Sequence, residues 1–237
     1  MKPELRDSAL YRKPISTLLF DMDNTLFDLV GAQIASCVEV ARSLGMDDGE
    51  DLFTYFLRPL WGFEAHENIS DYMQDHEISG NDRFHAACQI YEAAKLRYIT
   101  PYDGVISTLR ILQDKGYRMG IVTDAHSRDA TRRLEKTGLL QFFDTLVAYD
   151  MVLVKKPAHE PFLLALEMLR SGFSETLVVG DSPRRDIEPC KQLGIKTVYA
   201  RYGDRFSQTR NFEGADFIID SMDQLPGILN HVSSHSF

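Results

Sequence analysis

Cysteine is scarce in this chain, and its placement argues against two classes of protein. Only Cys37, Cys88 and Cys190 occur among 237 residues, far apart and with no C-x-x-C pair. Disulfide-stabilised miniproteins and cysteine zinc sites both depend on several cysteines at short spacings. We therefore expect three buried or half-buried thiols in a reducing compartment.

Long hydrophobic runs are also missing. No stretch approaches the roughly 18 consecutive apolar residues that a membrane-spanning helix needs. The first residues, MKPELRDSALYRKP, are charged and lack the apolar centre of a signal peptide. We therefore expect a cytoplasmic protein with no membrane partner.

Positive charge is in short supply, and the deficit is local. The chain has 26 Lys and Arg against 35 Asp and Glu, a formal net charge of −9. Residues 46–82 hold ten acids and one base, Arg58, which leaves 25 acids and 25 bases elsewhere. Because so acidic a chain has no general attraction for nucleic acid or anionic lipid, we expect neither as a partner.

Six short apolar runs, of the kind that form buried parallel strands, are spaced along the chain. They end at Phe20, Thr123, Tyr149, Gly180, Ala200 and Asp220. Between them, residues 103–115 and 160–170 carry apolar side chains at helical spacing. Alternating strands and helices predict an α/β fold with a Rossmann-like parallel sheet flanked by helices.

The alternation is interrupted between residues 28 and 100, which contain no convincing buried strand. Helical patterns in this interval cover residues 29–44, 52–60 and 83–98. Because a loop of this length is uncommon inside a compact domain, we predict a small inserted all-α domain at 28–100. Residues 1–27 and 101–237 would then form the sheet domain.

Polar residues follow the predicted strands, and ligands of open parallel sheets bind at the carboxyl ends of the strands. In chain order these residues are Asp21, Asp23, Asn24, Thr25, Thr123, Asp124, Lys156, Asp181 and Asp186. Carboxylates that lie close together repel one another unless a cation lies among them, and oxygen-only ligands suit Mg²⁺. The set therefore predicts a site for a divalent cation.

These residues resemble the four motifs of the haloacid dehalogenase superfamily. The motifs are Asp-Met-Asp-Asn-Thr at 21–25, Thr123, Lys156-Pro157, and Gly180-Asp181 followed by Asp186. The resemblance extends from about residue 16 to 219 and points to the phosphoglycolate phosphatase-like branch, with a helical cap inserted after the first motif. It implies a Mg²⁺-dependent phosphatase that hydrolyses a small phosphomonoester through an aspartyl-phosphate.

The resemblance implies a role for each reacting position. Asp21 would be the nucleophile that attacks phosphorus. Asp23 would protonate the leaving oxygen and then activate the hydrolytic water. Thr123 and Lys156 would bind the transferring phosphoryl group, and Lys156 would also hold Asp21 in place.

The resemblance also implies a set of metal ligands. Asp21 and Asp181 would bind Mg²⁺ through their carboxylates, and Asp23 through its backbone carbonyl. Asp186 would either hold a metal-bound water or orient Lys156.

Other residues beside the predicted site are candidates for contact with substrate. Asp124 and His126 could bind substrate, and Asp124 could instead cap the helix that starts near Ser127. Asp124 also stands where relatives frequently carry Asn. Arg184 and Arg185 are expected at the surface, with contact to an anionic substrate as the alternative.

Several alternatives remain open. A phosphoglucomutase-like transferase would also keep Asp21 and Asp23. A haloacid dehalogenase is disfavoured because that branch carries no acid at the position of Asp23. A phosphonatase needs a cap lysine, and 28–92 contains none, which leaves only Lys95. A non-catalytic binding protein is expected to lose a catalytic group, and none is missing. The substrate is open, as is the choice between monomer and homodimer.

Overall fold

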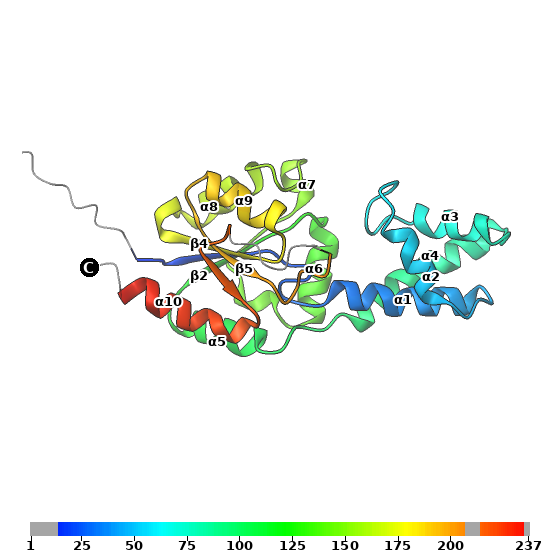
Figure 1. The fold of residues 1–237 in the computed structure, drawn as a ribbon, viewed down its shortest axis with the longest axis horizontal. Coiled ribbons are helices and arrows are strands. Elements are labelled where there is room, and N and C mark those ends of the chain that lie inside the picture. The colour runs from blue at the N-terminus through cyan, green and yellow to red at the C-terminus, as the bar shows by residue number, and fades with distance from the viewer. Residues whose placement is uncertain (1–13, 207–213, 235–237) are drawn as a thin grey trace, which may run out of the picture. The chain divides into compact units, whose positions relative to one another are not determined.

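The computed structural model describes residues 14–206 and 214–234, and they form two compact units (Figure 1). One unit comprises Phe27–Pro101 together with Glu135–Thr137, and the other comprises the remaining described residues. The first unit is helical, and the second contains the sheet. The use of residues 28–100 as a cap stays a prediction.

The sheet has six strands, all parallel. They are β1 Thr17–Phe20, β2 Arg118–Val122, β3 Thr145–Val147, β4 Thr176–Gly180, β5 Lys196–Ala200 and β6 Phe217–Ile219. Their order is β3-β2-β1-β4-β5-β6, so the strand order reverses at β1. Each predicted apolar run forms one strand, and the α/β prediction is confirmed.

Helices cover both faces of the sheet, with α5 and α10 on one face and α8 and α9 on the other (Figure 1). Their bounds are α5 Val105–Asp114, α6 Ser127–Lys136, α7 Tyr149–Val152, α8 Glu160–Leu169, α9 Glu188–Gln192 and α10 Leu225–Ser234. The apolar face of α8 packs Phe162 and Leu166 against Val122 and Val178 of the strands. This packing removes apolar surface from water and stabilises the sheet.

The insert consists of four helices with a core of their own. They are α1 Leu29–Ser43, α2 Gly49–Phe56, α3 Glu67–Asp75 and α4 Asn81–Tyr98. Helix α2 begins earlier than predicted because Asp48 caps it, accepting the backbone N–H groups of Glu50 and Asp51 at 3.0 Å. Helix α3 was not predicted, since its inward face consists of only a few residues among polar neighbours.

All three thiols are free and buried. Burial raises the pKa of Cys37 to about 12 and that of Cys88, beside Glu92, to about 11. Within the described residues, no helix is long and apolar enough to cross a membrane.

Candidate active site

The site lies where β1 ends, at the position where the strand order reverses. The backbone N–H of Asp21 still donates to Val179 O of β4 at 2.9 Å. The chain then leaves the strand through a turn in which Leu26 N–H donates to Met22 O at 2.9 Å and Asn24 has a positive φ of 66°. The neighbouring ends of β2 and β4 carry Thr123 and Asp181, so the topology brings three predicted residues to one edge.

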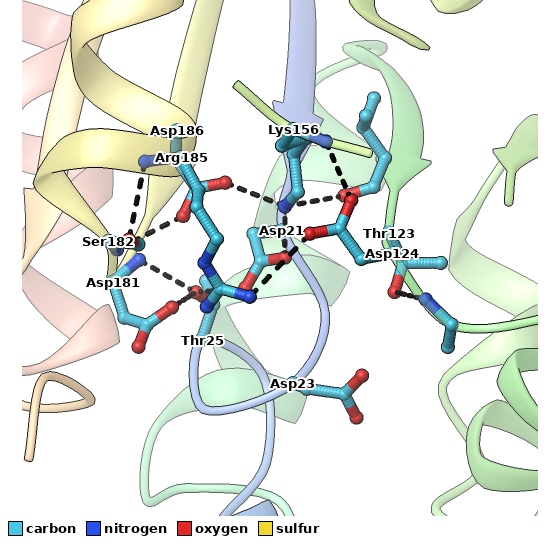
Figure 2. Close-up of polar contacts among 12 residues, drawn as sticks. Asp21, Asp23, Thr25, Thr123, Asp124, Lys156, Asp181, Ser182, Arg185 and Asp186 are labelled. Atoms are coloured by element: carbon cyan, nitrogen blue, oxygen red, sulfur yellow. Dashed lines mark hydrogen bonds and ion pairs between the residues drawn. The ribbon is translucent and has the colours of Figure 1, made fainter. Parts of the chain in front are cut away.

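Lys156 is the central cation of the site (Figure 2). Its Nζ lies 2.5 Å from Asp21 Oδ1 and 2.6 Å from Asp186 Oδ1, and it donates to Val122 O at 3.2 Å. Burial by itself would lower the pKa of Lys156, but the carboxylates of Asp186 and Asp21 raise it above its usual value. The buried ammonium therefore stays charged.

Thr25 joins the two loops that carry Asp21 and Asp181. Its hydroxyl donates to Asp21 Oδ2 at 3.0 Å and accepts the backbone N–H of Asp181 at 3.0 Å. Burial by itself would raise the pKa of Asp21, but Lys156 and Arg185 hold it below its usual value. Asp21 is therefore an oriented, ionised carboxylate. Sequence reasoning gave Thr25 no role, although it is part of the first motif.

Three buried carboxylates form a cluster. Oxygens of Asp21, Asp181 and Asp186 lie within 4.8 Å of one another. Burial and the neighbouring carboxylates of Asp21 and Asp186 raise the pKa of Asp181 well above its usual value. Burial also raises the pKa of Asp186, although Lys156 opposes the shift. All ligand atoms of this cluster are carboxylate oxygens, and such a donor set fits a hard divalent cation. Lys156 pairs with two of the three acids.

Asp186 reaches the cluster because Gly180 has no side chain. A Cβ atom at Gly180 would lie 2.4 Å from the Cβ of Asp186. The second oxygen of Asp186 accepts the backbone N–H of Ser182 at 3.0 Å. These contacts fit the alternative in which Asp186 orients Lys156.

The side chain of Asp23 lies apart from this cluster (Figure 2). Its Oδ1 pairs with Arg133 Nη1 of α6 at 2.8 Å. The metal role predicted for Asp23 concerns its backbone carbonyl, not this carboxylate. Sequence reasoning missed Arg133 because the two residues are 110 positions apart.

Thr123 and Asp124 follow β2. Thr123 is buried, and its hydroxyl accepts the backbone N–H of Ala125 at 3.2 Å, so its proton can be donated elsewhere. Asp124 Oδ1 accepts the backbone N–H of Lys156 at 2.9 Å. The predicted alternative that Asp124 caps the helix at Ser127 is wrong, because Asp150 accepts the Ser127 N–H at 2.7 Å.

His126 and the arginines differ in how they relate to the site. His126 is exposed and packs edge-on against Tyr149, with ring centroids 5.2 Å apart. Arg184 is exposed, as expected. Arg185 is half-buried, so the expectation of a surface residue holds only in part, and its Nη1 lies 3.6 Å from Asp124 Oδ2. The turn at Pro183–Ile187 directs Arg185 across the site (Figure 2).

Fold and site together define an α/β protein with a charged cluster at the switch point of its parallel sheet. The family described as haloacid dehalogenase-like hydrolase matches residues 18–200. Pyrophosphatase PpaX of Bacillus velezensis is 31% identical over 215 residues, which are 90% of this chain and 95% of the relative. The chain therefore belongs to the haloacid dehalogenase-like hydrolase family.

One further relative and one solved structure are similar to this chain. Glyceraldehyde 3-phosphate phosphatase of Pyrococcus furiosus is 28% identical over 228 residues, 91% of this chain and 93% of the relative. A Thermotoga maritima structure, provisionally named a beta-phosphoglucomutase, has a TM-score of 0.79 at 24% identity. It covers 92% of this chain and 100% of its own, and it shows the shared fold. The chain is an enzyme of this hydrolase family.

Proposed function

We propose that this hydrolase is a Mg²⁺-dependent phosphatase that acts on a small phosphomonoester through an aspartyl-phosphate on Asp21. The observation that carries the proposal is the environment of Asp21, whose two oxygens are held by Lys156 and Thr25 at 2.5 and 3.0 Å. A nucleophilic carboxylate must be ionised and aimed before substrate arrives. Both conditions are supported by its buried contacts with one cation and one hydroxyl.

In the first step, an oxygen of Asp21 attacks phosphorus as the bond from phosphorus to the leaving oxygen breaks. Asp23, in its protonated form, gives its proton to that oxygen, and the alcohol departs. In the second step, ionised Asp23 takes a proton from water as the water oxygen attacks phosphorus. The bond to Asp21 breaks, inorganic phosphate leaves, and both acids return to their starting forms.

Cationic and hydroxyl donors would hold the transferring phosphoryl group. Thr123 is buried directly after β2, Lys156 is buried in the loop after α7, and Arg185 reaches the same site from the segment after β4. Donors that are fixed before the reaction stabilise the developing charge without reorganisation. Arg185 thus extends the phosphate-binding set of Thr123 and Lys156, and its Nη1 pairs with Asp124 Oδ2 at 3.6 Å.

The donor set fits Mg²⁺. Asp21 and Asp181 would hold the ion through carboxylate oxygens, together with the backbone carbonyl of Asp23. Asp186, the third acid of the cluster, is paired with Lys156 at 2.6 Å. When bound, the ion would offset the repulsion between the Asp21 carboxylate and the phosphate.

The names of two relatives support a class of substrate and differ in the compound. One is named a pyrophosphatase and another a glyceraldehyde 3-phosphate phosphatase, both of which describe small phosphorylated substrates. We propose the same class here, with the insert serving as the cap that selects among its members. The likeness to the Thermotoga protein concerns the fold, so it gives no support to the transferase alternative.

A hydrolysis panel of small phosphoesters and pyrophosphate, with and without Mg²⁺, tests the proposal. Asp21→Asn should lower turnover by about 10³-fold or more on every substrate that the wild type accepts. Asp103→Asn, at an exposed position, is the matched control and should retain activity. Full activity in Asp21→Asn, or no hydrolysis by the wild type across the panel, contradicts the proposal.

A further inference from the structure

Arg133 is a buried cation on a helix that otherwise turns its charges outward. Its side chain is 5% exposed, whereas Arg128 and Arg132 of the same helix are exposed. The neighbouring inward positions of α6 are Ala130 and Leu134, both fully buried. Burying a guanidinium is costly unless a partner compensates for the lost hydration, so its position requires an explanation.

The ion pair with Asp23 supplies that explanation. Arg133 Nη1 donates to Asp23 Oδ1 at 2.8 Å, and the carboxylate is 18% exposed. A guanidinium is planar and rigid. When buried, it therefore restricts the position of a bound carboxylate more tightly than an ammonium would. Asp23 itself lies in a turn, next to Asn24 with its positive φ, and not on a regular strand.

We propose that Arg133 is a positioning residue that sets the placement of the Asp23 carboxylate for proton transfer. The inference rests on the proposed function, because it takes Asp23 as the acid and base of phosphate ester hydrolysis. Arg133 acts through Asp23 and does not touch the reacting phosphorus. Sub-ångström errors in the placement of a proton donor slow the step that uses it.

This role predicts a dependence on the leaving group that a purely structural role does not. An alkyl phosphate expels a basic oxygen that needs a proton from Asp23, whereas 2,4-dinitrophenyl phosphate expels a stable phenolate that does not. A misplaced Asp23 should therefore slow the first substrate and spare the second. A loosened fold should slow both equally. The value of kcat/KM is the right quantity, because it reports the steps up to expulsion of the leaving group.

The experiment compares Arg133→Met, Arg133→Lys and the control Arg132→Met on 2,4-dinitrophenyl phosphate and on the best alkyl phosphate from the panel. We expect Arg133→Met to lower kcat/KM about tenfold to hundredfold for the alkyl ester and less than about threefold for the aryl ester. Arg133→Lys should show the same selectivity with a smaller loss, and Arg132→Met should match the wild type.

A double-mutant cycle with Asp23→Asn completes the test. If Arg133 acts through Asp23, adding Arg133→Met to Asp23→Asn should cause no further selective loss. Equal losses on both esters, or an undiminished Arg133→Met effect in the Asp23→Asn background, would overturn the inference. If Arg133→Met does not fold, Arg133→Lys is the variant that tests the inference. The same ratio of kcat/KM between the two esters in Arg133→Lys as in the wild type would also overturn the inference. A wild type inactive on both esters refutes the proposed function instead.

Discussion

The Nζ atom of Lys156 lies 2.5 Å from Oδ1 of Asp21 and 2.6 Å from Oδ1 of Asp186, so one buried ammonium joins residues from three separate loops. The segments involved follow β1, β3 and β4. Because the three carboxylates of the cluster repel one another, the position of this cation affects both stability and chemistry.

Lys156→Met should therefore lower both the stability and the hydrolytic activity of the protein. Removing one partner of a buried charge network leaves uncompensated carboxylates, at a cost of about 3 kcal/mol or more in the free energy of unfolding. Hydrolysis should fall by at least about 100-fold, since a fixed cation at the phosphate is lost. Urea unfolding and steady-state kinetics measure the two effects. Lys155→Met, at the exposed neighbour, is the control, and equal behaviour of the two variants would contradict the account.

Thr25→Val tests the hydroxyl that links Asp21 with the backbone of Asp181. The two side chains have similar shapes, so the change removes a buried donor and acceptor with little change of volume. We expect a loss of about 1–3 kcal/mol in the free energy of unfolding, because the Asp181 N–H loses its partner. Activity should fall as Asp21 loses one of its two anchors. Thr25→Ser keeps the hydroxyl and should retain most of the stability and most of the activity. Stability and activity equal to those of the wild type in Thr25→Val would refute this role.

Divalent-cation binding can be measured without an activity assay. Adding Mg²⁺ to chelator-treated protein should raise Tm by roughly 5 °C or more at concentrations well above Kd. Asp181→Asn should remove most of this shift. The variant should not unfold earlier than the metal-free wild type, because it removes one of three repelling carboxylates. Asp103→Asn should keep the full shift, and a full shift in Asp181→Asn would exclude Asp181 as a ligand.

Arg185→Met should weaken phosphate binding more than it slows the chemical step. Its guanidinium approaches the site from the turn after β4 and neighbours Asp124 at 3.6 Å. We expect KM and the inhibition constant of inorganic phosphate to rise about tenfold, with a smaller change in kcat. The exposed Arg184→Met is the control. Unchanged phosphate inhibition in Arg185→Met would remove the residue from the phosphate-binding set.

The buried thiols should be inert in the native protein. A thiol reacts as its thiolate, and the pKa values of about 12 and 11 for Cys37 and Cys88 leave little thiolate at pH 8. Raising the pH toward these values should increase the thiolate fraction and the rate. A disulfide reagent at pH 8 should detect all three thiols after denaturation and almost none before it. Rapid stoichiometric reaction of the native protein would contradict their burial.

The sheet could be predicted because its central strands, such as β1 and β4, are buried throughout and appear as continuous apolar runs. Residues at the ends of those runs, such as Asp21 and Asp181, could be placed at one edge by topology alone. Helix α3 could not be predicted from the sequence, because Ile69, Tyr72 and Met73 are too few to show a clear helical period among polar neighbours.

Contacts between residues far apart in the chain could not be predicted from the sequence, for a different reason. Arg133 and Arg185 look like surface residues, since nothing in local composition says which charge turns inward. The roles proposed for them depend on the contacts with Asp23 and Asp124 that folding creates. The same limit made Asp124 look like a helix cap, when Asp150 fills that position.

The proposed aspartyl-phosphate on Asp21 can be tested by trapping it during turnover. Wild-type protein mixed with a turned-over substrate is quenched in acid within milliseconds, digested, and analysed by peptide mass spectrometry. We expect a phosphoryl group on Asp21 that is absent in Asp21→Asn. A phosphoryl group on another residue would contradict the proposed mechanism. So would the absence of phosphorylated Asp21 from time-resolved quenches that cover steady-state turnover of the wild type and of the slowed Asp23→Asn variant.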